Sequence, residues 1–131
     1  DPWDTWSMDN TLAMIILPML KQLKNEKHGS PHVDLEDVPE HLRFSETEEY
    51  DSQQCFDFYH EDEQSRHNCT VHDRWNWVLD EMIWAFEQKN TYWEEQFFST
   101  TSFDMKGAAE HQERMQNGFS LFGKYYEGLW D

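Results

Sequence analysis

This chain of 131 residues is poor in positive charge and has no long apolar run. Lysine and arginine together supply 10 residues against 27 aspartates and glutamates, which gives a formal net charge of -17. The shortage of cations argues against direct binding of nucleic acid, because the phosphates would be repelled. The longest apolar run, Leu12–Leu17, is far shorter than the roughly 20 residues that a membrane-spanning helix needs. We therefore expect neither a nucleic-acid-binding protein nor a membrane protein.

Cysteine and glycine are also scarce. Two cysteines, Cys55 and Cys69, do not make a disulfide framework, and we interpret them as reduced thiols in a cytosolic setting. The sequence has no glycine-rich phosphate loop, nucleophile elbow or Ser/His/Asp signature. It therefore predicts no cofactor and offers no positive argument for catalysis. Because the first residue is Asp1 and not methionine, we expect that an N-terminal portion is missing.

Apolar side chains recur at three- and four-residue spacing in three segments, which predicts three amphipathic helices. The first is expected over residues 7–27 and the third over residues 104–129. The second, over residues 72–89, is apolar on so wide an arc that it should lie at the centre of the domain. Their apolar faces are, in chain order, Met8, Leu12, Ile15, Ile16, Met19, Leu20 and Leu23; Trp75, Val78, Leu79, Met82 and Phe86; and Ala108, His111, Met115, Phe119, Phe122, Tyr126 and Leu129.

Proline and glycine modify these helices. Pro18 lacks the backbone donor that a helix interior uses, so we expect either a kink near Met14 or a helix that starts only near Pro18. Gly118 lies near the apolar face of the third helix, where it would allow a neighbouring helix to approach closely. The aromatic connection over residues 91–101 is expected to be either a short strand or a packed loop.

The sequence thus predicts an all-α fold, with a single helical domain over residues 1–131. Aromatic residues make up 16% of the chain, and their large buried areas favour an aromatic-rich core. Residues 30–71 are expected to form a long, acidic and largely irregular insertion between the first two helices. Between Asp34 and Glu63 there are 12 acidic residues against the single basic Arg43. We expect one short helix within this stretch, closing at His41–Arg43.

Potential metal ligands gather in that insertion and just after it. They are His60, His67, Cys69 and His72. Zinc prefers four Cys or His ligands in tetrahedral geometry, but the spacing here matches no known zinc finger. The alternative interpretation is a polar loop that happens to contain these residue types.

A second candidate set combines Asp80 and Glu81 of the second helix with His111 of the third. Di-iron bundles use paired Glu-x-x-His motifs, and neither helix carries one. Asp80 and Glu81 are more typical of a solvated flank or of partners for Arg74, Arg114 or Lys124. His111 falls on an apolar face, where a histidine is usually bonded to a carboxylate or a carbonyl oxygen.

Three blocks of the sequence resemble a family of uncharacterised proteins from marine tailed bacteriophages, including cyanophages. The blocks are Asp4–Arg43, RWNWVLDEMIWAFE at Arg74–Glu87, and His111–Asp131 with its ending LFGKYYEGLWD. Together they cover well over half of the chain. The resemblance implies a phage origin and a working place in the cytoplasm of the infected bacterium or in the virion. It assigns no catalytic or binding residues, because the family carries no established activity.

Three functional hypotheses follow. The first is a small, non-enzymatic phage accessory protein that binds another protein, and a basic partner would suit the charge. Mimicry of DNA is a sharper version of it, which requires acidic side chains in a regular double row. The alternatives are a metal-dependent enzyme of hydrolase type, which would use one of the two ligand sets, and a minor virion component.

Overall fold

The computed structural model describes residues 2–43 and 63–130, and these form an all-α fold. Its three long helices are α1 (Met8–Glu26), α3 (Glu63–Lys89) and α4 (Met105–Lys124). The described residues form no strand, apart from one isolated antiparallel bridge between Phe98 and Phe103. Short 3-10 helices accompany the long ones: η1 (Pro2–Thr5), η2 (Leu35–Asp37), η3 (Glu40–Leu42), η5 (Trp93–Phe97) and η6 (Tyr126–Gly128). The predicted fold class is confirmed.

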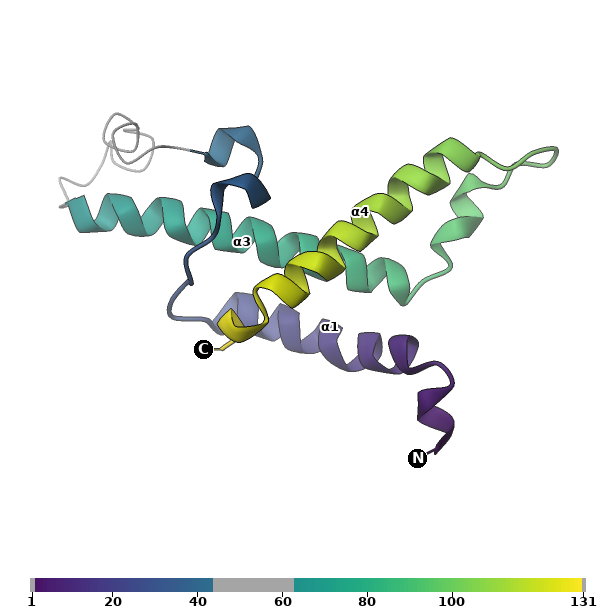
Figure 1. The fold of residues 1–131 in the computed structure, drawn as a ribbon, viewed down its shortest axis with the longest axis horizontal. Coiled ribbons are helices and arrows are strands. Elements are labelled where there is room, and N and C mark those ends of the chain that lie inside the picture. Colours follow the sequence, from purple (N-terminus) through teal and green to yellow (C-terminus); the bar gives the residue numbers. More distant parts are fainter. Residues whose placement is uncertain (1, 44–62, 131) are drawn as a thin grey trace.

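Helix α3 is the central element. α1 runs antiparallel to it on one side, and α4 crosses it obliquely on another, as Figure 1 shows. The predicted apolar stripe of α3 is buried along its whole length: Trp75 1%, Val78 0%, Leu79 0%, Met82 0% and Phe86 7% exposed. The broad apolar arc of this helix is therefore explained by contact with two helices at once.

The crossing of α3 and α4 depends on Gly118. A Cβ atom at this position would lie 2.5 Å from the Cβ of Ala85 and 2.8 Å from the carbonyl oxygen of Glu81. These distances are too short for any side chain, so the close approach predicted for Gly118 is confirmed. Gly123 lies in the same helix with nothing within 4 Å of an added Cβ. Packing therefore does not require a glycine there.

α1 (Met8–Glu26) matches the predicted residues 7–27 to within one residue at each end, so the alternative start near Pro18 is wrong. Pro18 is exposed within this helix, and the kink expected near Met14 stays a prediction. α4 begins beside Asp104, whose side chain accepts a hydrogen bond from the Gly107 backbone N–H at 3.0 Å, but it ends at Lys124 and not at residue 129.

The predicted irregular insertion over residues 30–71 is too long at both of its described ends. α3 already begins at Glu63, because a polar helical turn has no apolar period by which to recognise it. At the other end, Val33 and Val38 are each 2% exposed and belong to the core. Buried Arg74 donates from Nε to the Leu42 carbonyl oxygen at 2.7 Å, which holds the predicted short helix η3 against α3.

The aromatic connection after α3 is η5 followed by the Phe98–Phe103 bridge. A packed 3-10 turn thus replaces the expected strand or loop. η5 contacts α4, and this contact brings Trp93 beside His111.

Candidate functional site

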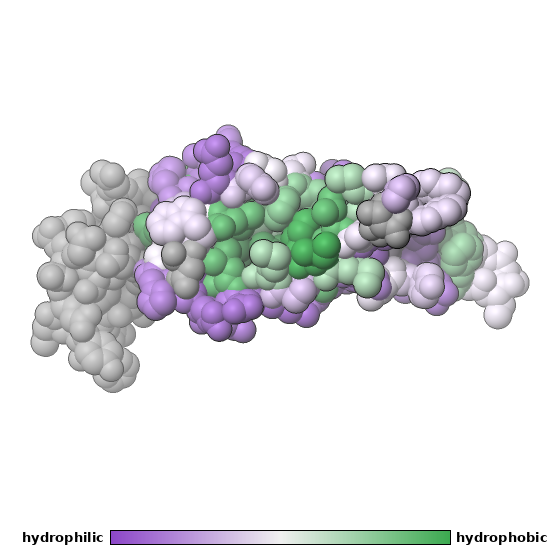
Figure 2. Space-filling model, turned by 90° about the horizontal axis from the view of Figure 1, so that it is seen from below, coloured by the Kyte–Doolittle hydropathy of each residue, from purple (hydrophilic) through white to green (hydrophobic). Residues whose placement is uncertain are grey.

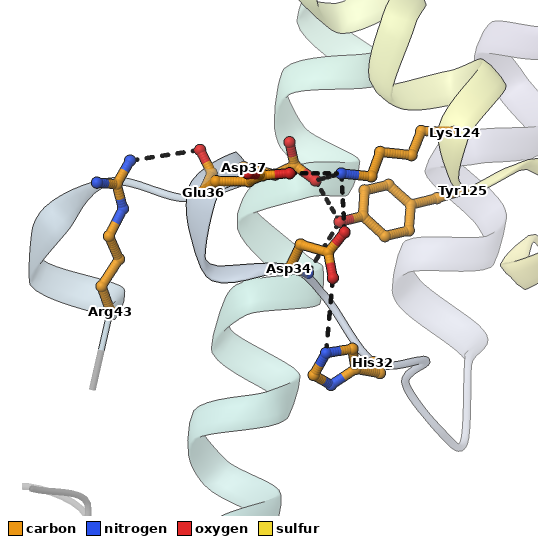
Figure 3. Close-up of polar contacts among 7 residues, drawn as sticks. All are labelled: His32, Asp34, Glu36, Asp37, Arg43, Lys124 and Tyr125. Atoms are coloured by element: carbon orange, nitrogen blue, oxygen red, sulfur yellow. Dashed lines mark hydrogen bonds and ion pairs between the residues drawn. The ribbon is translucent and has the colours of Figure 1, made fainter. Parts of the chain in front are cut away.

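A cluster of three carboxylates lies where η2 meets the end of α4. One carboxylate oxygen from each of Asp34, Glu36 and Asp37 lies within 4.8 Å of the other two. The ammonium of Lys124 is among them, at 2.8 Å from Asp34, 3.4 Å from Glu36 and 2.6 Å from Asp37. Figure 3 shows the three carboxylates converging on this nitrogen. Such an oxygen set suits a hard cation, and here the chain's own lysine supplies the cation.

Tyr125 completes the cluster. Its hydroxyl accepts a hydrogen bond from the Asp34 backbone N–H at 2.9 Å and donates one to Asp37 at 2.5 Å (Figure 3). The two bonds join residues about ninety positions apart in the chain. The cluster thus fastens η2 to the C-terminal end of α4, and we interpret it as a structural clamp.

The titration of the clamp follows from these contacts. The hydrogen bonds that Lys124 donates to Asp34 and Asp37 raise the pKa of Lys124 above its ordinary value, and Lys124 in turn lowers the pKa of Asp34. Burial, followed by the hydrogen bond to Asp37, raises the pKa of Tyr125 to about 12. Each shift favours the protonation state that the clamp uses.

The predicted ligand set of Asp80, Glu81 and His111 does not come together. Asp80 pairs with Lys24 of α1. Glu81 instead forms a bidentate ion pair with Arg114 of α4, in which both N–O distances are 3.1 Å. His111 has a third environment. Adjacent positions on a helix point in different directions, so α3 sends these two carboxylates to different neighbours.

His111 occupies an aromatic box. Its ring stacks on Trp93 with centroids 4.8 Å apart, and it also meets Trp84 and Phe97 at 4.9 and 5.4 Å. Nε2 lies 2.9 Å from the side-chain carbonyl oxygen of Gln88, which is the kind of partner expected for a histidine on an apolar face. Burial, with a smaller contribution from the charge of Arg114, lowers the pKa of His111.

The other predicted ligand set lies largely beyond what the structure describes. His60 is outside the described residues, and so are the side chains of His67 and Cys69 within α3. His72 is half-buried, and its Nδ1 lies 2.5 Å from the Ser30 hydroxyl oxygen. Metal binding by this set stays a prediction.

An apolar groove of about 820 Å³ lies between α1 and the C-terminal segment. One wall comes from α1, and the other comes from the end of α4, η6 and the residues after it. Figure 2 shows hydrophobic residues gathered along the middle of this face, with hydrophilic residues on both sides. The lining consists of Leu12, Ile16, Met19, Leu20, Gln22, Leu23, Glu26, Phe122, Tyr126, Leu129 and Trp130.

The walls of the groove are open to solvent. Met19 is 65% exposed on one wall, and Tyr126 and Trp130 are 63% and 69% exposed on the other. The sequence assigned Met19 and Tyr126 to inward faces of their helices, and this is a correction. Towards the C-terminal end of α4 the buried positions are Gly118 and Leu121, and Tyr125 continues this face directly after the helix. Leu121 and Tyr125 each come one residue before the predicted Phe122 and Tyr126.

A chain of aromatic rings connects the groove to the core. The ring of Phe86, which is 7% exposed, contacts that of Phe122 edge-to-face at 5.2 Å between centroids. Phe122 contacts Tyr126 in the same way at 5.8 Å. Such contacts between aromatic rings fix their relative geometry. The wall formed by the C-terminal segment is therefore anchored to the core.

Comparison with known proteins assigns no family to the chain. No family model, curated protein or solved structure matches it. Within residues 2–43 and 63–130, no helix combines the length and the apolar character that crossing a membrane requires.

Proposed function

We propose that this chain is a non-enzymatic binding protein for a partner protein with a basic surface. The observation that carries the proposal is the open apolar groove, because exposed apolar patches on a protein surface typically mark interaction sites. The groove is anchored to a buried core, and so its shape is held before a partner arrives. Preformed sites of this kind bind with a smaller loss of conformational entropy.

The charge distribution supports a basic partner. Five cations among the described residues pair with carboxylates of the same chain, which leaves the large acidic excess without compensation. The pairs are Lys21–Glu87, Lys24–Asp80, Lys89–Asp9 and Arg114–Glu81, together with Lys124 and its cluster. A net charge of -17 steers cationic surfaces towards the protein and repels anionic ones.

DNA mimicry is supported less well than simple recognition of a basic surface. It needs rows of uncompensated carboxylates, whereas Asp80, Glu81 and Glu87 of α3 each pair with a lysine or an arginine. This pairing neutralises the acidic side of α3 that could have supplied such a row. The apolar groove, in turn, has no counterpart in the DNA surface.

The place of action is part of the proposal. The three sequence blocks that resemble phage proteins support a role as an accessory protein in the cytoplasm of an infected bacterium, with the virion as the other location. Mass spectrometry of purified phage particles distinguishes the two. Detection of the chain in particles at a fixed copy number would replace the cytoplasmic location with the virion.

The binding proposal is tested by affinity capture from bacterial lysate on the immobilised chain, at about 0.15 M salt, where long-range electrostatic attraction is largely screened. The matched control is a polyglutamate matrix of equal charge density, which reports simple ion exchange. We expect that at least one basic protein is retained on the immobilised chain and is washed off the polyglutamate matrix at the same salt concentration. Retention of the same proteins on both matrices would refute the proposal.

A further inference from the structure

We infer that the groove between α1 and the C-terminal segment binds one amphipathic helix whose polar side carries lysine or arginine. The inference rests on the proposed function and specifies the partner's binding element. It follows from the shape of the groove, the residues of its walls and the charges at its rim.

The shape of the groove suits a helix. On α1, the lining residues Leu12, Ile16, Met19 and Leu23 follow one another at intervals of four, three and four residues. This is the interval at which a second helix packs its own apolar row along a first one. From Leu12 to Glu26 the lining extends over about 21 Å of helix, which matches about four turns of an occupant.

The wall on α1 carries a methionine, a residue that adapts to different partners. Met19 is 65% exposed in the lining of the groove. Unbranched, polarisable methionine side chains repack easily, and binding surfaces for amphipathic helices use them often. The opposite wall supplies large flat rings at Tyr126 and Trp130. Aromatic rings of this kind are the residues that dominate binding energy at protein interfaces.

The rim of the groove selects a cationic helix. Among residues 2–43 and 63–130, Glu26 is the single charged side chain of the lining, and no lysine or arginine belongs to it. The nearest lysines of α1, Lys21 and Lys24, turn away towards Glu87 and Asp80 of α3. A basic helix would therefore meet the negative charge of Glu26 in a lining to which no described lysine or arginine belongs.

The same charge disfavours the other occupants of an apolar groove. A second copy of the chain would also carry a net charge of -17. The repulsion between two chains of the same sign opposes their close association. An anionic lipid surface would be repelled in the same way. Amphipathic helices that lie on membranes are usually rich in lysine and arginine, and this acidic chain lacks that feature.

A synthetic peptide tests the inference directly. The probe is a leucine–lysine peptide of about 18 residues, with leucines on one helical face, and its affinity for the whole chain is measured by calorimetry at about 0.15 M salt. One control peptide has the same composition in shuffled order, and the other replaces every lysine with glutamate. We expect the ordered leucine–lysine peptide to bind at least about tenfold more tightly than either control.

Paired variants locate the binding site. In Met19→Gln/Trp130→Ala, one residue is changed on each wall of the groove. The matched control is Met14→Gln/Trp6→Ala, whose residues are 69% and 79% exposed and do not line the groove. Neither variant changes the net charge, and circular dichroism checks that both remain folded. We expect the dissociation constant of the ordered peptide to rise about tenfold in the groove variant and by less than about twofold in the control.

Each other outcome overturns the inference. Equal affinities for the ordered and shuffled peptides would show that charge alone attracts them. Equal losses in both variants would place the contact outside the groove. Concentration-dependent dimers that the groove variant dissociates would identify a second copy as the occupant, and binding to phosphatidylcholine vesicles would identify a membrane. If the groove variant captures a basic protein as well as the wild type does, the inferred helix-binding groove is refuted, while the proposed function as a binding protein is preserved.

Discussion

Helices α3 and α1 are both strongly apolar, but only α3 has its apolar surface fully covered. Leu79 and Met82 of α3 are each 0% exposed, whereas Ile15 and Met19 of α1 are 52% and 65% exposed. The difference arises because α3 has a long helix on two sides, whereas α1 has its main contact with α3 and leaves a flank to the groove (Figure 1). A row of apolar residues therefore predicts a surface that is favourable to bury. It does not show that other parts of the same chain bury it.

The largest effect should separate two methionines on these helices. Met82→Ala would lose buried contacts and leave a cavity, at a cost of about 2 to 5 kcal/mol of unfolding free energy. Met19→Ala removes the same atoms from an exposed position and should change stability by less than about 0.5 kcal/mol. Urea unfolding followed by tryptophan fluorescence measures both. Similar losses in the two variants would show that α1 is covered in solution, and the contrast between the helices would disappear.

A smaller effect should separate the two glycines of α4. Gly118→Ala places a Cβ against Ala85 and the Glu81 carbonyl, and the resulting overpacking should exceed the gain in helix propensity by about 1 to 2 kcal/mol. Gly123→Ala meets no neighbour and should stabilise the protein by up to about 1 kcal/mol. Opposite shifts in thermal midpoint are the expected result. Shifts of the same sign would mean that the two helices cross with more space between them than a glycine contact requires.

The smallest predicted effect is a pH dependence of stability that arises from Tyr125, which is buried in the clamp. Tyr125, which is 8% exposed, has a folded-state pKa of about 12 against an ordinary value of 10.0. Its neutral form is therefore favoured in the folded protein, so its contribution is complete below about pH 10 and is lost as the pH rises towards 12. Lys124, whose pKa is also raised, acts in the same direction. We expect the wild-type protein to lose about 1 kcal/mol more stability than Tyr125→Phe over this interval.

Two measurements check this expectation. Urea midpoints of both proteins at about pH 9 and about pH 11 give the change in stability. Ultraviolet absorbance of tyrosinate should reveal one late-titrating tyrosine in the wild type, and this component should be missing from Tyr125→Phe. Parallel pH profiles for the two proteins would contradict the role given to Tyr125.

Hydrophobic spacing in the sequence correctly predicted burial where a helix is covered by neighbours along its whole length. The stripe from Trp75 to Phe86 was correctly assigned to the core, because it faces neighbours along its whole length. The N-terminal boundary of α4 was also predictable, since Asp104 caps it through a contact only three residues long. Gly118 was recognisable because a glycine within a helix lowers its stability, and close packing against a second helix can offset that cost.

Long-range contacts could not be predicted in this way. The clamp joins Asp34 and Asp37 to Lys124, about ninety residues later, and no local period connects them. The acidic spacing at Asp34, Glu36 and Asp37 was a visible signal, although its partner was not. The groove was missed because its residues share a helix with core residues, and only the position of α4 decides which of them are covered.

The lysine in the clamp also sets how the protein responds to its surroundings. A cation borrowed from solution leaves when its concentration falls, whereas Lys124 is tied to the chain and stays at a high effective concentration beside its three carboxylates. The link between η2 and α4 therefore needs no dissolved cation to supply its positive charge. Because Lys124 and Glu36 are partly exposed, rising salt concentration should weaken their attraction.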